Sequence, residues 1–354
     1  MSVVVVDRGR VAASDPTTRA HREPLVAPAC LKTGALAIVV VLCGLLAVSA
    51  PVRHNMLWTG DAPFFHAIAR HPFGSGGWLH PEKFGDAYRY GRILFPFGAW
   101  ALALGRPAWV GGSLVVVYVV SFGAWVALAA EHLRRNGRRP ALALWIFAFP
   151  FSILAFFRPE AVSDPMAGAL LFLVYLYERE GRTRAACIAG ALLVLTREPM
   201  ALALVPLMWT AGRSRGWRGV RMWAAALVPY AAWTVWLRVH VGQFPFTDPS
   251  VSRRQALAGP FGGYAQMLRE GTDLSQKLGM IVAAATLAAV VIVAVVMRGR
   301  WHYPLTHGAV ALAVVIPFLG IAVFEHPIEA FRVVVPLQAL LLVIALDRRE
   351  AVIA

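Results

Sequence analysis

Apolar runs of up to about 20 residues, separated by polar or arginine-rich stretches, recur along this chain of 354 residues. A helix needs about 20 mainly apolar residues to cross a hydrocarbon core about 30 Å thick. The pattern therefore predicts an all-α fold, a polytopic transmembrane bundle of about eight to eleven membrane segments. We expect one transmembrane domain at 33–350, preceded by a cytoplasmic, disordered N-terminus at 1–32.

The runs interpreted as membrane segments are 33–52, 93–105, 109–131, 142–157, 161–177, 185–208, 222–241, 278–297, 304–324 and 333–346. The run 93–105 has 13 residues, which is short for a full crossing, so two topologies stay open there. The run 185–208 contains Arg197-Glu198-Pro199. Proline disfavours helix at the preceding residue and suits the first turn of a new helix. We therefore predict two short helices that meet at Arg197 and Glu198.

Composition and charge narrow the class of protein further. Hydrophobic residues make up 58% of the chain and charged residues 15%, which excludes a disordered chain and disfavours a water-soluble enzyme. The net charge is +15, but the arginines gather at the ends of apolar runs, as the positive-inside rule describes for cytoplasmic loops. This pattern predicts a multi-pass protein of the lipid bilayer with both termini in the cytoplasm, and it argues against nucleic-acid binding.

The polar stretch 53–92 then forms the first outer loop. It is rich in aromatic residues, so we expect it to fold as interfacial helices on the membrane surface. It also contains four histidines, His54, His66, His71 and His80. His66 and His71 are five positions apart, a poor spacing for one helical face, so a metal site is a minor alternative.

Ionisable residues collect on the outer side of this topology. They are Asp61, Arg158, Glu160, Asp164, Arg197, Glu198, Glu325, His326 and Arg332. Several of them precede prolines that interrupt helices, and broken helices occur at membrane depth where the backbone lines a protein-enclosed or aqueous cavity. Ionisable residues within membrane segments are functional candidates. We therefore predict an outward-facing polar cavity.

The chemistry of such a cavity follows from its residue types. Asp61 could act as a general base for a hydroxyl group, or it could cap the helix that Pro63 begins. Arg158, Arg197 and Arg332 could hold a phosphate, because guanidinium groups match phosphate oxygens in a bidentate way. Alternatives stay open for several of these residues. Arg197 and Glu198 could form a structural ion pair, and Arg158 could merely mark the membrane interface. His326 and Arg332 could serve either substrate or structure, and Tyr88, Tyr90 and Arg92 could anchor a helix at the interface or contact substrate.

Three short motifs carry a resemblance to a known family: Gly60-Asp61-Ala62-Pro63-Phe64-Phe65, Tyr88-Arg-Tyr-Gly-Arg-Ile-Leu-Phe-Pro96 and Leu195-Thr-Arg-Glu-Pro199. The chain resembles the GT-C membrane glycosyltransferases, specifically bacterial relatives of the mannosyltransferases of glycolipid assembly. The resemblance implies an essential aspartate in the first outer loop, which Asp61 matches. Many members carry a paired acid there, whereas Ala62 follows Asp61; Asp86, Glu160 or Asp164 could supply a second acid.

The resemblance further implies transfer of mannose or a similar sugar from a polyprenyl-phosphate donor to a glycolipid or cell-envelope glycan acceptor on the outer face. The location would be a bacterial inner membrane. Some members use a divalent metal ion, so a metal stays open although no residue is assigned to it. The alternatives are a transporter or flippase for a lipid-linked or anionic solute, and a non-catalytic membrane scaffold. A transporter requires polar residues that continue to the cytoplasmic side.

Overall fold

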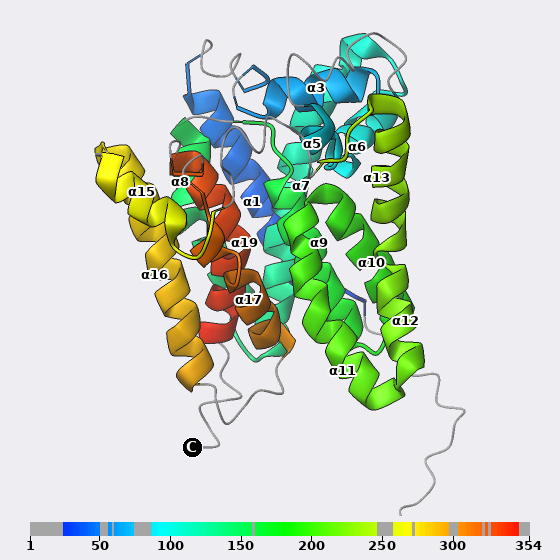
Figure 1. The fold of residues 1–354 in the computed structure, drawn as a ribbon, viewed down its shortest axis with the longest axis vertical. Coiled ribbons are helices and arrows are strands. Elements are labelled where there is room, and N and C mark those ends of the chain that lie inside the picture. The colour runs from blue at the N-terminus through cyan, green and yellow to red at the C-terminus, as the bar shows by residue number, and fades with distance from the viewer. Residues whose placement is uncertain are drawn as a thin grey trace, which may run out of the picture.

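The computed structural model describes residues 24–49, 56–58, 60–73, 86–157, 160–245, 258–270, 273–296, 304–320, 323–324 and 327–346. This part of the chain is helical and contains no strand, as Figure 1 shows, which confirms the all-α part of the predicted fold class. The first half contains α1 (Pro28–Ala47), α3 (Ala62–Arg70), α5 (Asp86–Tyr90), α6 (Leu94–Leu102), η1 (Pro107–Trp109), α7 (Val110–Arg135), η2 (Pro140–Ala148), α8 (Pro150–Phe157) and α9 (Asp164–Arg179). The second half contains α10 (Thr183–Thr196), η3 (Glu198–Leu204), α11 (Val205–Arg215), α12 (Trp217–Ala225), α13 (Val228–Val241), α15 (Gly262–Glu270), α16 (Leu274–Val296), α17 (Pro304–Ala313), η5 (Ile316–Phe318) and α19 (Pro327–Ala345).

Prolines determine where many of these helices begin. Pro28, Pro150, Pro304 and Pro327 are the first residues of α1, α8, α17 and α19. Proline suits the first helical turn because its φ angle is fixed and the missing N–H has no intrahelical partner there. One consequence is that α1 begins at Pro28, inside the segment 1–32 that we predicted to be disordered.

The predicted break at Arg197 is present, and further breaks, including those in the runs 142–157 and 304–324, were not predicted. The helix α10 ends at Thr196, and η3 begins at Glu198. The run 142–157 consists of η2 and α8, which meet at Pro150, and the run 304–324 includes α17 followed by η5. Proline at 150 and 317 explains both breaks, because a proline inside a helix removes a hydrogen bond and clashes with the preceding turn.

Among the described residues, three helices are long and apolar enough to cross a membrane by length and composition. They are Pro28–Ala47, Pro107–Arg135 and Gln276–Val296. The helix α6, in contrast, has nine residues and reaches only about 14 Å, which is well short of a bilayer core.

The helix α7 is the centre of the bundle. About 72% of its most apolar 18-residue stretch is buried, whereas the corresponding buried shares are 22% for α1 and 28% for α16. The helices α1, α6 and α9 pack against α7, and α16 packs against α19. Close contact between α1 and α7 depends on Gly34, because a Cβ there would lie 2.7 Å from the backbone oxygen of Gly123. The outer sides of α1 and α16 expose leucines and valines, as expected for helices that face lipid.

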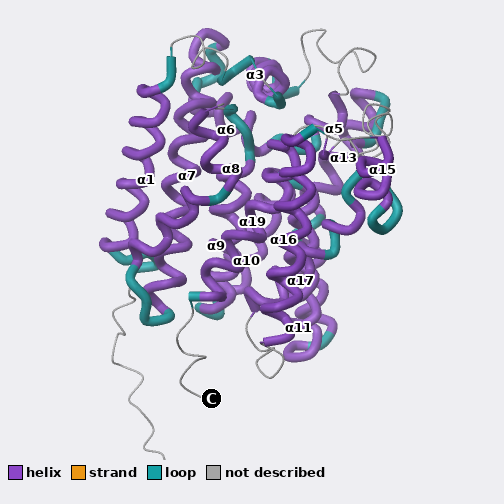
Figure 2. Tube along the Cα trace, turned by 90° about the vertical axis from the view of Figure 1, so that its left-hand side faces the viewer, coloured by secondary structure: helices purple, strands orange, loops and turns teal. Residues whose placement is uncertain are grey.

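The two ends of the bundle differ in structure. Figures 1 and 2 show α3 lying across one end, with α5 and α6 beside it, while α11 and α12 form the opposite end. Short helices α3 and α5 therefore fold within the predicted outer loop 53–92. The amphipathic α3 buries Phe65, Ile68 and Ala69 against the bundle, which positions the residue at its start, Asp61.

Candidate functional site

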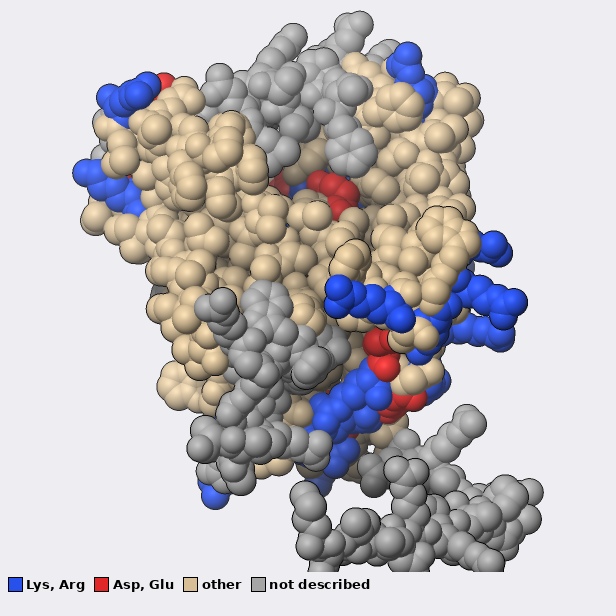
Figure 3. Space-filling view, turned by 60° about the horizontal axis from the view of Figure 1, so that its bottom comes forward, with Lys and Arg blue, Asp and Glu red and all other residues tan. Residues whose placement is uncertain are grey.

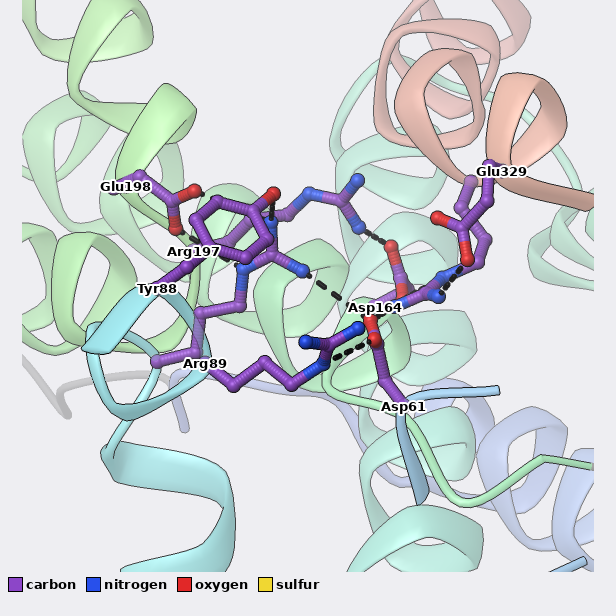
Figure 4. A network of polar contacts seen from close by, with 9 residues as sticks. Asp61, Tyr88, Arg89, Asp164, Arg197, Glu198 and Glu329 are labelled. Atoms are coloured by element: carbon purple, nitrogen blue, oxygen red, sulfur yellow. Dashed lines mark hydrogen bonds and ion pairs between the residues drawn. The ribbon is translucent and has the colours of Figure 1, made fainter. Parts of the chain in front are cut away.

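Asp61 occupies the N-cap position of α3, but its side chain makes no capping hydrogen bond. Its backbone oxygen accepts hydrogen bonds from the backbone N–H groups of Phe64 and Phe65, both at 3.1 Å. The side chain is 8% exposed and points instead into the bundle, as Figure 4 shows. Helix capping is therefore not what the Asp61 carboxylate does in this structure.

A left-handed glycine directs the chain into α3. Gly60 has a φ angle of 58°, which is unfavourable for a residue with a Cβ. A Cβ at Gly60 would also collide with the carboxylate of Glu160. The backbone N–H of Ala161 donates to the oxygen of Met56 at 3.1 Å, so the segments that precede α3 and α9 are tied together. This contact places Glu160, which is 9% exposed, against Gly60, the residue before Asp61.

Three arginines from two parts of the chain surround the carboxylate of Asp61. Arg89 Nε donates to Asp61 Oδ1 at 2.9 Å, and Arg332 Nη2 donates to Asp61 Oδ2 at 3.0 Å. Arg92 Nη1 lies 3.6 Å from Oδ2. The guanidinium of Arg89 also covers the ring of Phe64 at 3.8 Å, which adds a cation–π contact.

Arg332 links Asp61 to two further carboxylates. Its side chain is fully buried, and Nε donates to Asp164 Oδ2 at 2.9 Å. Nη1 donates to Glu329, one helical turn earlier in α19, at 2.8 Å. Asp164, also fully buried, forms a second ion pair with Arg197. One guanidinium group thus holds together the starts of α3, α9 and α19.

Arg92 forms a second part of the cluster. Its Nε and Nη2 donate to the two carboxylate oxygens of Glu198 at 3.1 and 3.2 Å, which is a bidentate pair. Arg92 also donates to the hydroxyl of Tyr88, one turn earlier. The backbone oxygen of Tyr90 accepts a hydrogen bond from Trp233 Nε1 at 2.7 Å, which attaches α5 to α13.

The cluster is close to electroneutral and largely shielded from solvent. Its ion pairs join four arginines (Arg89, Arg92, Arg197, Arg332) to four carboxylates (Asp61, Asp164, Glu198, Glu329). Burial alone would raise the pKa of Asp61, but the positive charges of Arg332, Arg89 and Arg92 outweigh it and hold the pKa below its usual range.

The opposite balance applies to Arg92. Burial alone would lower its pKa, and the charge of Glu198 outweighs this effect and raises the pKa. Arg197 differs from the other arginines because its Nε is buried without a hydrogen-bond partner among the described residues. Such a donor is costly to bury, and it is therefore available to an oxygen-rich ligand.

The structure brings together most of the residues that the sequence singled out. Those in the cluster or beside it are Asp61, Tyr88, Arg92, Glu160, Asp164, Arg197, Glu198 and Arg332. Arg158, Glu325 and His326 lie outside the described residues. The neighbours Arg197 and Glu198 do not close the helix break as a pair of their own, because Arg197 pairs with Asp164 and Glu198 pairs with Arg92.

Sequence reasoning missed Arg89 and Glu329. Arg89 lies within the motif Tyr88-Arg-Tyr-Gly-Arg92, three positions before Arg92, so both side chains project from one turn of chain. Glu329 precedes Arg332 by three positions in α19, the spacing at which opposite charges on a helix meet. Those two spacings are the signals that could have identified both residues.

Among the described residues, no group of three or more His, Cys, Asp or Glu side chains has the arrangement of a metal site. The carboxylates of the cluster face guanidinium groups instead of one another. The arrangement is suited to an anionic ligand with several oxygen atoms, which can take over guanidinium hydrogen bonds.

No family model, no curated protein and no solved structure matches this chain.

Proposed function

We propose that this protein is a membrane glycosyltransferase that uses the arginine–carboxylate cluster around Asp61 as its active site. It moves a mannose or a similar sugar from a polyprenyl-phosphate donor to a glycolipid or glycan acceptor. The observation that carries the proposal is the buried Asp61 carboxylate, held by Arg89 and Arg332 at the end of a bundle of apolar helices. The resemblance of the surrounding motifs to the GT-C family supports the same function.

The arginines are suited to hold the phosphate of the donor. Arg332 and Arg89 present several N–H groups toward one point, the Asp61 carboxylate, and phosphate oxygens fit the same fork-like geometry. Arg197 adds a buried Nε donor that has no partner among the described residues. Charge that develops on the leaving phosphate is stabilised by fixed donors of this kind in a site that excludes water.

The transfer step balances in atoms and charge. The acceptor hydroxyl oxygen forms a bond to the anomeric carbon of the sugar, and the bond from that carbon to the phosphate oxygen breaks. The phosphate leaves with the bonding electron pair and stays hydrogen-bonded to the arginines. Asp61 takes the proton of the acceptor hydroxyl.

Asp61 is a weak base while the arginines hold it, because they lower its pKa. The donor phosphate competes with Asp61 for the same N–H groups of Arg89 and Arg332. Each hydrogen bond that moves from the carboxylate to the phosphate makes Asp61 more basic. The geometry therefore couples donor binding to activation of the base, so that an acceptor hydroxyl is activated only beside a bound donor.

The distribution of polar groups favours a transferase over a transporter. The cluster lies near the end of the bundle that α3 covers, whereas the buried acid and the buried histidine of α7, Glu131 and His132, lie close to the C-terminal end of that helix. Between them α7 buries mainly apolar side chains such as Phe122, Trp125 and Val126. A transporter requires a polar path through this layer, and the described residues place apolar side chains there.

A transfer assay tests the proposal. The full chain in detergent is given radiolabelled polyprenyl-phosphate mannose, with glucose and arabinose donors in parallel, and a membrane glycolipid extract as acceptor. We expect Asp61→Asn to reduce transfer by at least about 100-fold, the range for loss of a general base. Glu270→Gln is the matched control, because Glu270 is an exposed acid of α15 outside the cluster, and it should transfer normally.

Donor binding separates the competing outcomes. Retained binding of radiolabelled donor by Asp61→Asn, together with lost transfer, is the result we expect of a base. Equal transfer by Asp61→Asn and the unmodified protein would remove Asp61 from the chemistry. Donor flux across sealed vesicles without any transfer would replace the transferase with the flippase.

A further inference from the structure

The end of the bundle opposite the cluster carries a pocket that the proposed function does not use. It has a volume of about 480 Å³, within the range of small-molecule sites, and it is open to the surface. It lies between the start of α10 and the helical hairpin of α11 and α12. Its lining consists of Gly181, Arg182, Thr183, Arg184, Ala185, Arg215 and Met222.

The pocket is lined by three arginines and no acid. Arg215 is held in place by its hydrogen bond to Thr183 Oγ1 at 2.6 Å, while its nearest carboxylate, Glu178, is 4.0 Å away. Arg182 lies 3.5 Å from Glu180, whose other oxygen pairs with Arg135 at 2.7 Å. Both pairs are partly exposed and therefore weak.

Arg184 is the least engaged of the three lining arginines. Its side chain is exposed, and it has no acidic partner within the described part of the chain. The positive charge of the pocket is therefore available to an anion.

The surroundings of the pocket extend this positive surface. The helices α11 and α12 also expose Arg213, Arg218 and Arg221, and Figure 3 shows basic side chains crowded at this end of the molecule with few acidic ones between them. A positively charged surface attracts anionic groups over one Debye length, about 8–10 Å.

Aromatic and apolar side chains adjoin the charges. Trp209 is 62% exposed and Trp217 is 69% exposed, and the guanidinium of Arg213 stacks over the ring of Trp209 at 4.7 Å. Exposed tryptophans beside arginines are typical of the level at which lipid headgroups meet the hydrocarbon core. Met222 and Ala185 supply an apolar side to the pocket itself.

We infer that this pocket binds the headgroup of an anionic phospholipid, with Arg184 and Arg215 on the phosphate and Met222 against the adjoining glycerol and acyl carbons. Basic pockets between membrane helices recognise acidic lipid headgroups through this combination of charge and apolar contact. The inference is independent of the proposed transfer reaction, because the residues that line the pocket belong to the end of the bundle formed by α11 and α12, opposite the end that carries α3 and Asp61.

Lipid binding to the purified full chain tests this site. Fluorescent phosphatidylglycerol is titrated into protein in neutral detergent, with fluorescent phosphatidylcholine as the zwitterionic comparison. We expect saturable binding of phosphatidylglycerol only, and a loss of affinity of about tenfold or more in the double variant Arg184→Gln/Arg215→Gln. Arg269→Gln, an exposed arginine on α15 at the other end, is the matched control and should bind normally.

Further arms of the experiment decide between the alternatives. Arg215 contacts Thr183, so the double variant could misfold; Arg184→Gln alone has no such contact and should still weaken binding about threefold. The inference is overturned if Arg184→Gln and the double variant both bind the lipid as tightly as the unmodified protein. Complete displacement of the lipid by inorganic phosphate at about 10 mM also overturns it, because the site would then recognise free phosphate instead of a lipid headgroup.

Discussion

Removal of Arg332 tests whether the cluster holds the helices together. The Arg332 side chain has no solvent exposure and binds Asp61, Asp164 and Glu329 at 3.0, 2.9 and 2.8 Å. The variant Arg332→Met keeps an apolar stem of similar length but leaves three carboxylates with one cation fewer. Removal of one partner from a buried ion pair costs about 3–5 kcal/mol, because the remaining charge stays buried without compensation. We expect a loss of unfolding free energy within that range.

Unfolding of the purified protein by increasing SDS in mixed micelles measures this loss. The buried Trp125 and Trp223 provide a fluorescence signal for the transition. Arg182→Met serves as a matched control because the Arg182 pair with Glu180 is 3.5 Å long and half exposed, so the expected change is below about 1 kcal/mol. Equal stability of the Arg332→Met protein and the control would refute the reasoning.

A double-mutant cycle separates the ion pair from the rest of the substitution. Asp164→Asn removes the charge that faces Arg332 Nε, and Asp164 is itself fully buried. Combined with Arg332→Met, it removes both charges, so the double variant should lose about 0.5–3 kcal/mol less than the two single losses added together. Additivity within about 0.5 kcal/mol would mean that the two side chains do not interact as the structure indicates.

Three further predictions concern the site. The lowered pKa of Asp61 means that its charge stabilises the folded state at neutral pH, and that this stabilisation fades as the pH falls below about 3.9, the usual Asp value, toward the folded pKa. Asp61→Asn should therefore be less stable than the unmodified protein at neutral pH, and its stability should approach that of the unmodified protein in acid. Thermal unfolding of both proteins across pH 3–7 measures this, and a stability difference that does not change with pH would contradict it. Arg92→Lys should lose about 1.5 kcal/mol of SDS-unfolding free energy, because an ammonium cannot span both oxygens of Glu198; an unchanged midpoint would show that the second hydrogen bond is immaterial. Gly60→Ala should lower the free energy of unfolding by about 2 kcal/mol or more, because it combines left-handed backbone strain with a collision with Glu160. Adding Glu160→Ala should relieve only the collision. Unchanged stability of Gly60→Ala would contradict the φ angle of 58°.

Local features of the chain predicted much of the helical layout. The long apolar run of α7 is recognisable from composition alone, and Pro199 marks the break that separates α10 from η3. Both signals act over a few residues, because proline affects its own turn and apolar content sets the length of a span. The breaks at Pro150 and Pro317 followed from the same rule but were missed, since a continuous apolar run was interpreted as one helix.

The sequence by itself determined that the fold is helical and which residue types the candidate site would contain. Asp61, Asp164, Arg197 and Arg332 are conspicuous wherever they occur, because charges near apolar runs are expensive unless they are paired. The long-range pairing among them had no such local signal. Asp61 and Arg332 are 271 positions apart, and only the packing of α3, α9 and α19 brings them within 3.0 Å.

The tertiary structure alone decided how the charges pair. It directs Asp61 away from the end of α3 toward Arg89 and Arg332, and it gives the neighbours Arg197 and Glu198 separate partners. Distance in space determines which side chains pair, and at a helix break that distance depends on the direction in which each following segment packs. Such directions are set by contacts between elements far apart in the chain, and no short stretch of sequence records them.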